Sequence, residues 1–271
     1  MNTQNLGYLS RLIKFTGFGE DHEKDLKMQL VSGLRDFVLL HTQEFGPDRA
    51  RATLYFHKAA SVDLYFFNRY DVEVMTNRHA LPVRQTFYIS SKADHITFQE
   101  AYNLLSGRSV QKEHRPKEGE MHRIWLQLDF KETDPGGQYK FKQYHPNYGF
   151  DLEVVLRKHP IQELTTAEGT VRLLESLSRG NRQQVTYGES GKEQKVFIEA
   201  LPQFKSIRIY DDAMRPVVAA GMPPQAVPVD GSRSIRPEQT VSLSPIKKEF
   251  TASPSLTQGE LWPQKQKIEE V

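Results

Sequence analysis

TFQEAYNLLSGRSVQK, residues 97–112, is the stretch that decides the fold of this chain. Thr97 and Glu100 have the spacing of a capping box, in which each side chain accepts a hydrogen bond from the backbone N–H of the other residue. Apolar residues then recur at helical spacing as far as Gly107, a residue that adopts the left-handed conformation of a helix C-cap at little cost. A strand-like run follows at 108–112. The stretch therefore predicts a helix, a glycine cap and a strand in succession.

The same order occurs three times along the chain. Helix-like runs also end at Gly33 and Gly180, which lie 74 residues before and 73 residues after Gly107. Each glycine is followed by a basic residue and by three strand-like runs that polar turns separate. A near-constant period indicates that one supersecondary unit is repeated. We expect an α+β protein of three units, each with one helix on its own three-stranded antiparallel meander.

The expected strands can be placed from alternating apolar and aromatic residues. They lie at 37–41, 52–57 and 62–67, then at 108–112, 122–130 and 139–144, and finally at 184–187, 195–200 and 204–210. A further strand-like stretch at 85–89 is expected to widen one sheet. The predicted units span residues 1–92, 93–160 and 161–215. Residues 216–271 hold eight of the 15 prolines and show no period, which predicts a disordered tail.

Composition restricts the possible functions. The 271 residues carry a formal net charge of only +2, so any contact with nucleic acid must come from local patches. The chain has no cysteine, which excludes disulfides, thiolate nucleophiles and cysteine-ligated metals. No run approaches the roughly 18 apolar residues that a membrane-spanning helix needs. These features predict a cytoplasmic protein without a membrane partner.

Three segments resemble a family of uncharacterised proteins from Bacteroidota. The segments are 101–110, 140–152 and 200–205, and the resemblance covers about residues 1–218. Proteins of that family share a domain of unknown function and are often encoded on conjugative and other mobile elements. The resemblance implies a role in DNA mobility or element maintenance, and it implies no catalytic residue. The mixed-charge tail departs from the lysine-rich ends expected in that family.

Motifs for enzymatic chemistry are missing from the sequence. It contains no phosphate-binding loop, no His-Glu-x-x-His and no Gly-x-Ser-x-Gly. His114 and His122 lie on either side of an expected turn, and a metal there would need Glu118 or Glu120 as a further ligand. Solvated loop residues are the favoured interpretation. No catalytic residue, metal or cofactor is therefore predicted.

A non-catalytic binding module that meets a protein or a nucleic acid is the favoured function. Aromatic residues interleaved with cations on a sheet can stack bases while they neutralise phosphates. The exposed candidates on the strands are Trp125, Tyr139, Lys140, Lys142, Tyr144 and Arg208. His145 opens the string His-Pro-Asn-Tyr-Gly, which is favoured as a simple turn, and Trp262 in the tail is a candidate anchor for a partner.

The alternative function is a metal-dependent nuclease or hydrolase with a carboxylate site. Its candidate residues are the aspartates on or beside the expected strands, namely Asp63, Asp71, Asp129, Asp151, Asp211 and Asp212. Tyr210-Asp211 repeats the pair Tyr70-Asp71 at a similar place in another unit. That repetition favours a structural role for these aspartates.

Overall fold

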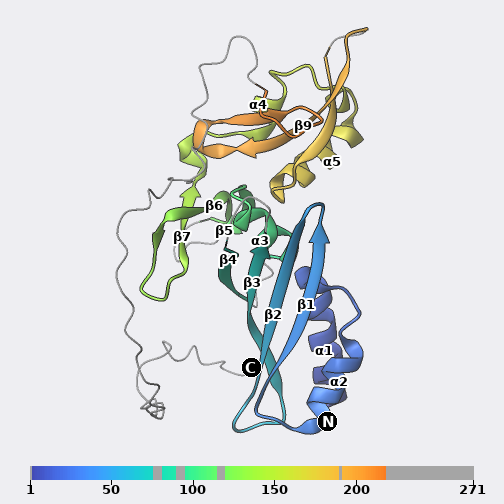
Figure 1. Cartoon of the computed structure of the whole chain (residues 1–271), viewed down its shortest axis with the longest axis vertical. Coiled ribbons are helices and arrows are strands. Elements are labelled where there is room, and N and C mark those ends of the chain that lie inside the picture. The colour runs from blue at the N-terminus through green and yellow to red at the C-terminus, as the bar shows by residue number, and fades with distance from the viewer. Residues whose placement is uncertain (1, 76–80, 90–94, 115–119, 189–190, 218–271) are drawn as a thin grey trace, which may run out of the picture. The chain divides into compact units, whose positions relative to one another are not determined.

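The computed structural model describes residues 2–75, 81–89, 95–114, 120–188 and 191–217 (Figure 1). Within these residues the chain consists of helices and three antiparallel sheets, which confirms the predicted α+β class. Apart from its first two residues, the predicted tail at 216–271 lies outside the described residues.

Three antiparallel sheets follow one another along the chain. The first sheet contains β1 (Asp36–Phe45), β2 (Asp48–Lys58), β3 (Tyr65–Met75) and β4 (Val83–Tyr88) in that order. The second contains β5 (Val110–His114), β6 (His122–Thr133) and β7 (Tyr139–Tyr144), and the third contains β8 (Gln183–Tyr187), β9 (Gln194–Leu201) and β10 (Ser206–Tyr210). The stretch expected at 85–89 is β4, which widens the first sheet.

The repeated helices end as the sequence predicts. They are α2 (Glu23–Ser32), α3 (Phe98–Leu105) and α5 (Ala167–Ser178). Gly33, Gly107 and Gly180 follow them with left-handed φ angles of 71°, 81° and 77°. The capping box of α3 is present, since Glu100 Oε2 accepts from the Thr97 backbone N–H at 2.8 Å and Thr97 accepts from the Glu100 N–H. The recurring glycine caps give the three units the same exit from helix to strand.

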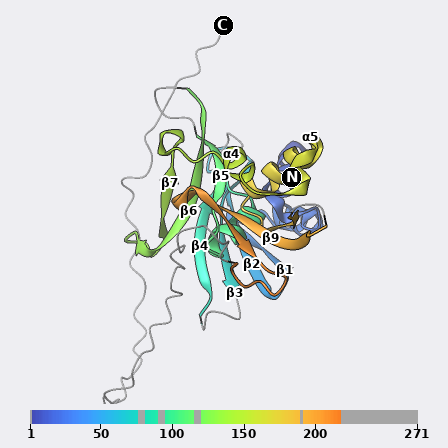
Figure 2. The same cartoon turned by 90° about the horizontal axis from the view of Figure 1, so that it is seen from above.

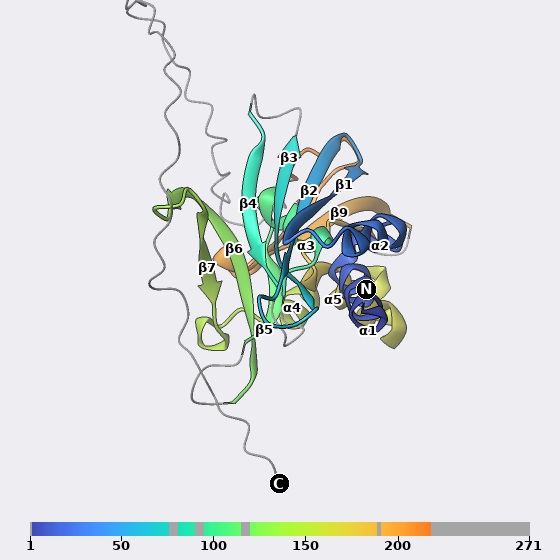
Figure 3. The same ribbon diagram turned by 90° about the horizontal axis from the view of Figure 1, so that it is seen from below.

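Other helices lie outside the repeat. These are α1 (Thr3–Ile13), the π-helical turn η1 (Lys14–Phe18) and the short α4 (Leu152–Leu156). Single 3-10 turns occur as η2 (Pro146–Tyr148), η3 (Gln162–Thr165) and η4 (Pro202–Phe204). The Asn5 side chain anchors α1, because it donates to the Tyr65 carbonyl and accepts from the Tyr65 N–H. In Figure 3, α1 and α2 run beside each other next to the first sheet.

The units share their cores, which differs from the expectation that each helix packs on its own sheet. α3 contacts β3 and β4 of the first sheet as well as β5 and β6, and α5 contacts β5 as well as β8 and β9. Val110 and Leu128 of the second sheet belong to the core of the first sheet, whereas Trp125 belongs to the core of the third. Each face of the second sheet contributes buried apolar side chains, Leu128 on one and Trp125 on the other, so the sheet packs against a neighbour on each side.

Side-chain amides join the first and second sheets at their edges. Gln85 of β4 accepts from the Tyr139 N–H at 2.8 Å and donates to the Tyr139 carbonyl at 3.2 Å. Gln138 in turn accepts from the Thr86 N–H at 2.6 Å. These bonds imitate strand pairing, and they cover backbone groups that an exposed edge would otherwise offer to another chain. β4 lies next to the second sheet in Figure 2.

Two histidines in the first core give the chain an expected pH dependence. His22 Nε2 lies 3.0 Å from His41 Nδ1, and burial lowers the pKa of both side chains, although the charge of Asp21 opposes this. A histidine with a lowered folded-state pKa resists a proton that the unfolded chain accepts below about pH 6.5. The urea midpoint is therefore expected to fall between pH 7 and pH 5. The fall should be smaller in His41→Gln, and an equal fall in both proteins would contradict the prediction.

Candidate functional site

A pocket of about 430 Å³ lies between the second sheet, α4 and α5. Its wall on the second sheet includes Arg123, Trp125 and Tyr144, and the turn after β7 adds His145. Phe150 and the start of α4 line the side that faces the third sheet's core. The volume falls in the range of small-ligand sites. The pocket thus gathers three of the residues that the sequence selected.

Strand register explains why the pocket has an aromatic wall. Trp125 of β6 pairs with Tyr144 of β7, so their side chains share one face of the second sheet. Trp125 packs edge-on against Phe150 with ring centroids 5.4 Å apart. The Tyr144 hydroxyl donates to Gln127 Oε1 at 3.3 Å, and burial raises the pKa of Tyr144. The wall is therefore a fixed apolar surface with one neutral phenol.

Arg123 supplies the free charge of the pocket. Both acidic residues of the lining have other roles, since Asp151 accepts from the Val154 N–H at the start of α4 and Glu153 pairs with Arg157 at 2.6 Å. Arg123 is exposed and has no ion-pair partner in the part of the chain that the structure describes. Glu113 lies opposite Arg123 in the pairing of β5 with β6 but forms no ion pair with it, so the guanidinium beside the aromatic wall is available to a phosphate ester.

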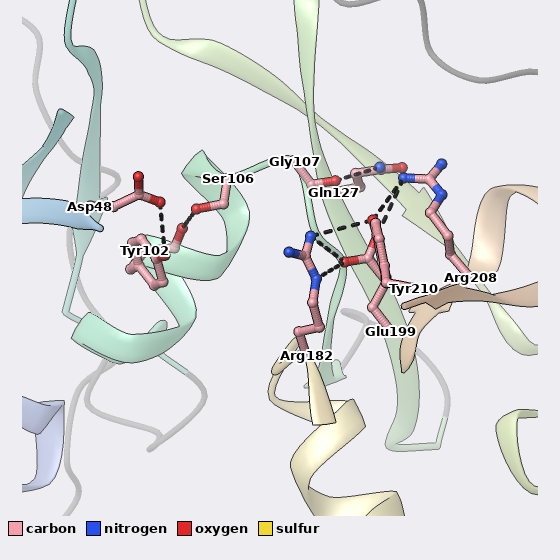
Figure 4. A network of polar contacts seen from close by, with 9 residues as sticks. All are labelled: Asp48, Tyr102, Ser106, Gly107, Gln127, Arg182, Glu199, Arg208 and Tyr210. Carbon is pink, nitrogen blue, oxygen red and sulfur yellow. Dashed lines mark hydrogen bonds and ion pairs between the residues drawn. The ribbon is translucent and has the colours of Figure 1, made fainter. Parts of the chain in front are cut away.

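Two arginines surround one buried carboxylate, that of Glu199 in the third sheet (Figure 4). Glu199, 4% exposed, accepts from Arg182 at 3.0 Å, from Arg208 at 3.3 Å and from the Tyr210 hydroxyl at 2.7 Å. Arg182 comes directly after the cap at Gly180 and its neighbour Asn181. The network therefore holds two guanidinium groups around one carboxylate.

Arg108 adds a third guanidinium next to this network. Its side chain lies over the Tyr102 ring at 5.0 Å, and its Nε and Nη2 atoms are buried without a hydrogen-bond partner among the described residues. Burial lowers the pKa of Arg108, while the charge of Glu199 raises it. Gln127 joins this region to the pocket, because it donates to the carbonyl of Gly107 (Figure 4) and accepts from Tyr144. Positive charge is thus in excess behind the aromatic wall.

Two of the predicted binding residues are not where the sequence placed them. Trp125 was expected on the surface, but it is 3% exposed because its face of β6 packs on the third sheet's core. Tyr139 points to the opposite face, where it packs against the first core and the ring of Phe130. The expectation that both aromatics stand exposed on one surface with the lysines is therefore wrong.

The other candidates are distributed over three places. Tyr144 and His145 line the pocket, and Arg208 belongs to the Glu199 network. Lys140 and Lys142 are both engaged, since they pair with Glu132 at 3.1 Å and Asp129 at 2.8 Å. Trp262 lies outside the described residues. Arg123 was not among the residues that the sequence selected; its place two residues before Trp125, on the same face of a strand, was the available signal.

Five of the six aspartates of the alternative function, all but Asp212, have a partner of their own. Asp63 pairs with Lys58, Asp71 accepts from Tyr55 and Thr86, and Asp211 pairs with Arg215. Among the residues that the structure describes, no three His, Cys, Asp or Glu side chains as they stand form a group that could hold a metal ion.

Comparisons of the chain with protein families, curated proteins and solved structures found no match. None of the described helices combines the length and the apolar character that crossing a bilayer requires.

Proposed function

We propose that this chain is a non-catalytic module that binds single-stranded nucleic acid and holds one nucleotide in the pocket between the second sheet, α4 and α5. The observation that carries the proposal is the juxtaposition of Trp125, Tyr144 and the unpaired Arg123 around a volume of about 430 Å³. Single-strand binding proteins combine aromatic stacking surfaces with cations that follow the backbone. The pocket offers both in one place.

Each part of the pocket suits one part of a nucleotide. Tyr144, the partly exposed ring of the aromatic wall, can stack on a base of any sequence while the buried Trp125 supports the wall, and base stacking on an aromatic ring contributes roughly 1–3 kcal/mol. Arg123 and His145 provide donors for the phosphate at the rim. The surplus of arginines around Glu199 adds a positive field behind the wall. A role in a mobile element, as the sequence resemblance implies, is consistent with such a ligand and stays part of the proposal.

A protein partner would call for a different surface. Peptide ligands use a free sheet edge or an extended apolar groove, whereas the observed pocket has the volume of a single small ligand. The alternative of a metal-dependent nuclease draws no support from the aspartates, because the partners described above already engage Asp63, Asp71 and Asp211. We therefore favour binding of nucleic acid without cleavage.

Trp125 itself can report on the occupied pocket. The chain has two tryptophans, so Trp262→Phe leaves Trp125 as the only indole. A short single-stranded oligonucleotide is expected to quench its fluorescence, with an affinity that falls steeply as salt rises. Arg123→Gln in the same background should raise the dissociation constant about tenfold, which corresponds to about 1.4 kcal/mol.

The matched control is Arg172→Gln, which removes an exposed arginine of α5 that pairs with Glu168 instead of lining the pocket. It should bind like the parent protein. Absence of quenching at low salt, or equal binding by the Arg123 and Arg172 variants, would overturn the proposal. Capture of the same protein partner before and after nuclease treatment, together with no quenching, would favour a protein ligand instead.

A further inference from the structure

Three histidines from separate strands meet at one end of the second sheet. His114 ends β5, His122 begins β6, and His145 follows the last residue of β7. The first two are paired across the strands, and their ring centroids lie 5.4 Å apart. His145 brings a third ring within 5.8 Å of His114 and 5.5 Å of His122. All three side chains are partly exposed, so solutes can reach them.

The spacing of the rings is that of imidazoles around one metal ion. A metal–nitrogen bond of about 2.1 Å in tetrahedral geometry holds two ligand nitrogens about 3.4 Å apart and two ring centroids between about 5 and 6 Å apart. His122 Nε2 and His145 Nδ1 are separated by 3.2 Å. All three observed centroid separations also fall in this range.

Backbone contact selects the nitrogen that His122 can offer. Its Nδ1 lies 3.2 Å from the Glu120 carbonyl, which can only accept a hydrogen bond, so the proton belongs on Nδ1. Nε2 then carries a lone pair that faces His145 Nδ1. Metal ligands of this kind commonly donate their other ring N–H to a carbonyl, which fixes the orientation of the ring. A metal ion would take the place of the proton between His122 and His145, and that proton would move to His145 Nε2.

We propose that His114, His122 and His145 bind one transition-metal ion, with Zn²⁺ as the expected ion, through three imidazole nitrogens. As they stand, the three side chains do not form a group that could hold a metal ion. Their centroid spacing fits, so metal binding requires the rings to reorient about their side-chain torsions. Water would fill the fourth position. His145 also lines the proposed nucleotide pocket, whereas His114 and His122 do not, so loss of Zn²⁺ binding in His114→Gln and His122→Gln tests this inference apart from nucleic-acid binding.

Metal titration of the full chain without a histidine tag tests this site. After removal of metals with EDTA and dialysis, calorimetry with Zn²⁺ should show one ion per chain, and Co²⁺ should give the intense visible absorption of a tetrahedral complex. The thermal midpoint should rise with Zn²⁺, because the ion binds the folded state. His114→Gln, His122→Gln and His145→Gln should each weaken binding at least about tenfold, in line with the loss of one ligand.

The chain contains its own control in the other close histidine pair. His22 and His41 have nitrogens 3.0 Å apart, but His41 packs edge-on against the rings of Phe18 and Phe98. His41→Gln should therefore leave Zn²⁺ binding unchanged. Circular dichroism before titration shows whether each variant is folded. The proposal is overturned if the folded parent protein binds no Zn²⁺, if His41→Gln abolishes binding, or if His145→Gln binds as tightly as the parent.

Discussion

Gly180→Ala is expected to lower the free energy of unfolding by about 3 kcal/mol or more, whereas the same change at Gly33 should cost only about 1 kcal/mol. Both glycines end a repeated helix with φ near the left-handed region, at 77° and 71°. An alanine pays the same conformational cost at either cap. The difference in stability between the two variants must therefore come from the atoms that the added Cβ would contact.

The surroundings of the two caps differ sharply. A Cβ at Gly180 would lie 2.7 Å from the Ser109 carbonyl oxygen and 2.9 Å from Val110 Cγ1, whereas a Cβ at Gly33 meets nothing within 4 Å. The Ser109 carbonyl belongs to backbone at the start of β5, which cannot move without disturbing the second sheet. Overpacking of this kind costs typically 1–3 kcal/mol in addition to the backbone strain. The Gly180 variant therefore carries two penalties.

Urea unfolding of the two variants and the parent protein measures this difference. Gly107→Ala is a further control, because its Cβ would find only Phe130 Cε2 at 3.9 Å, an ordinary contact. It should behave like Gly33→Ala. Equal losses at Gly33, Gly107 and Gly180 would contradict the view that the third unit is docked closely on the second.

The repeat could be predicted from the sequence because its signals are local. Glycine caps, a capping box at Thr97 and strand alternation each depend on neighbouring residues, so the three sheets appear close to the predicted positions, although β3 (Tyr65–Met75) extends well past its expected end at residue 67. The helix α1 was missed, although Leu6, Leu9 and Ile13 have helical spacing. Gly7 and Ser10 weaken the intrinsic helix preference there, and the buried contact of Asn5 with Tyr65 that holds the helix is not local.

The site was less predictable because packing decides it. Alternation correctly places Trp125 on the face of β6 opposite Leu128, yet no local rule says that both faces are covered. If only the Leu128 face of the second sheet were covered, Trp125 would lie on the surface. The histidine cluster has the same origin, since His145 is 23 residues from His122 and only the pairing of β6 with β7 brings them together.

Replacing Glu199 by glutamine is expected to destabilise the chain by about 3–5 kcal/mol, the cost of removing one partner from a buried ion pair. The Glu199 side chain is 6% exposed, and those of Arg182 and Arg208 are 16% and 19% exposed. Without the carboxylate, these two guanidinium groups and Arg108 would remain close together with no negative charge. Water cannot solvate them fully at this depth.

A matched control separates burial from pairing. Glu153→Gln also breaks an arginine pair, but Glu153 and Arg157 are exposed neighbours on one helical turn, so the loss should stay below about 0.5 kcal/mol. A rescue variant sharpens the test. Arg182→Leu in the Glu199→Leu background removes one excess charge and should recover part of the stability, because apolar replacements of buried ion pairs are often tolerated. If Glu199→Gln lowered the free energy of unfolding as little as Glu153→Gln does, the three arginines would have to be solvated. The excess positive charge assigned to this region would then have no support.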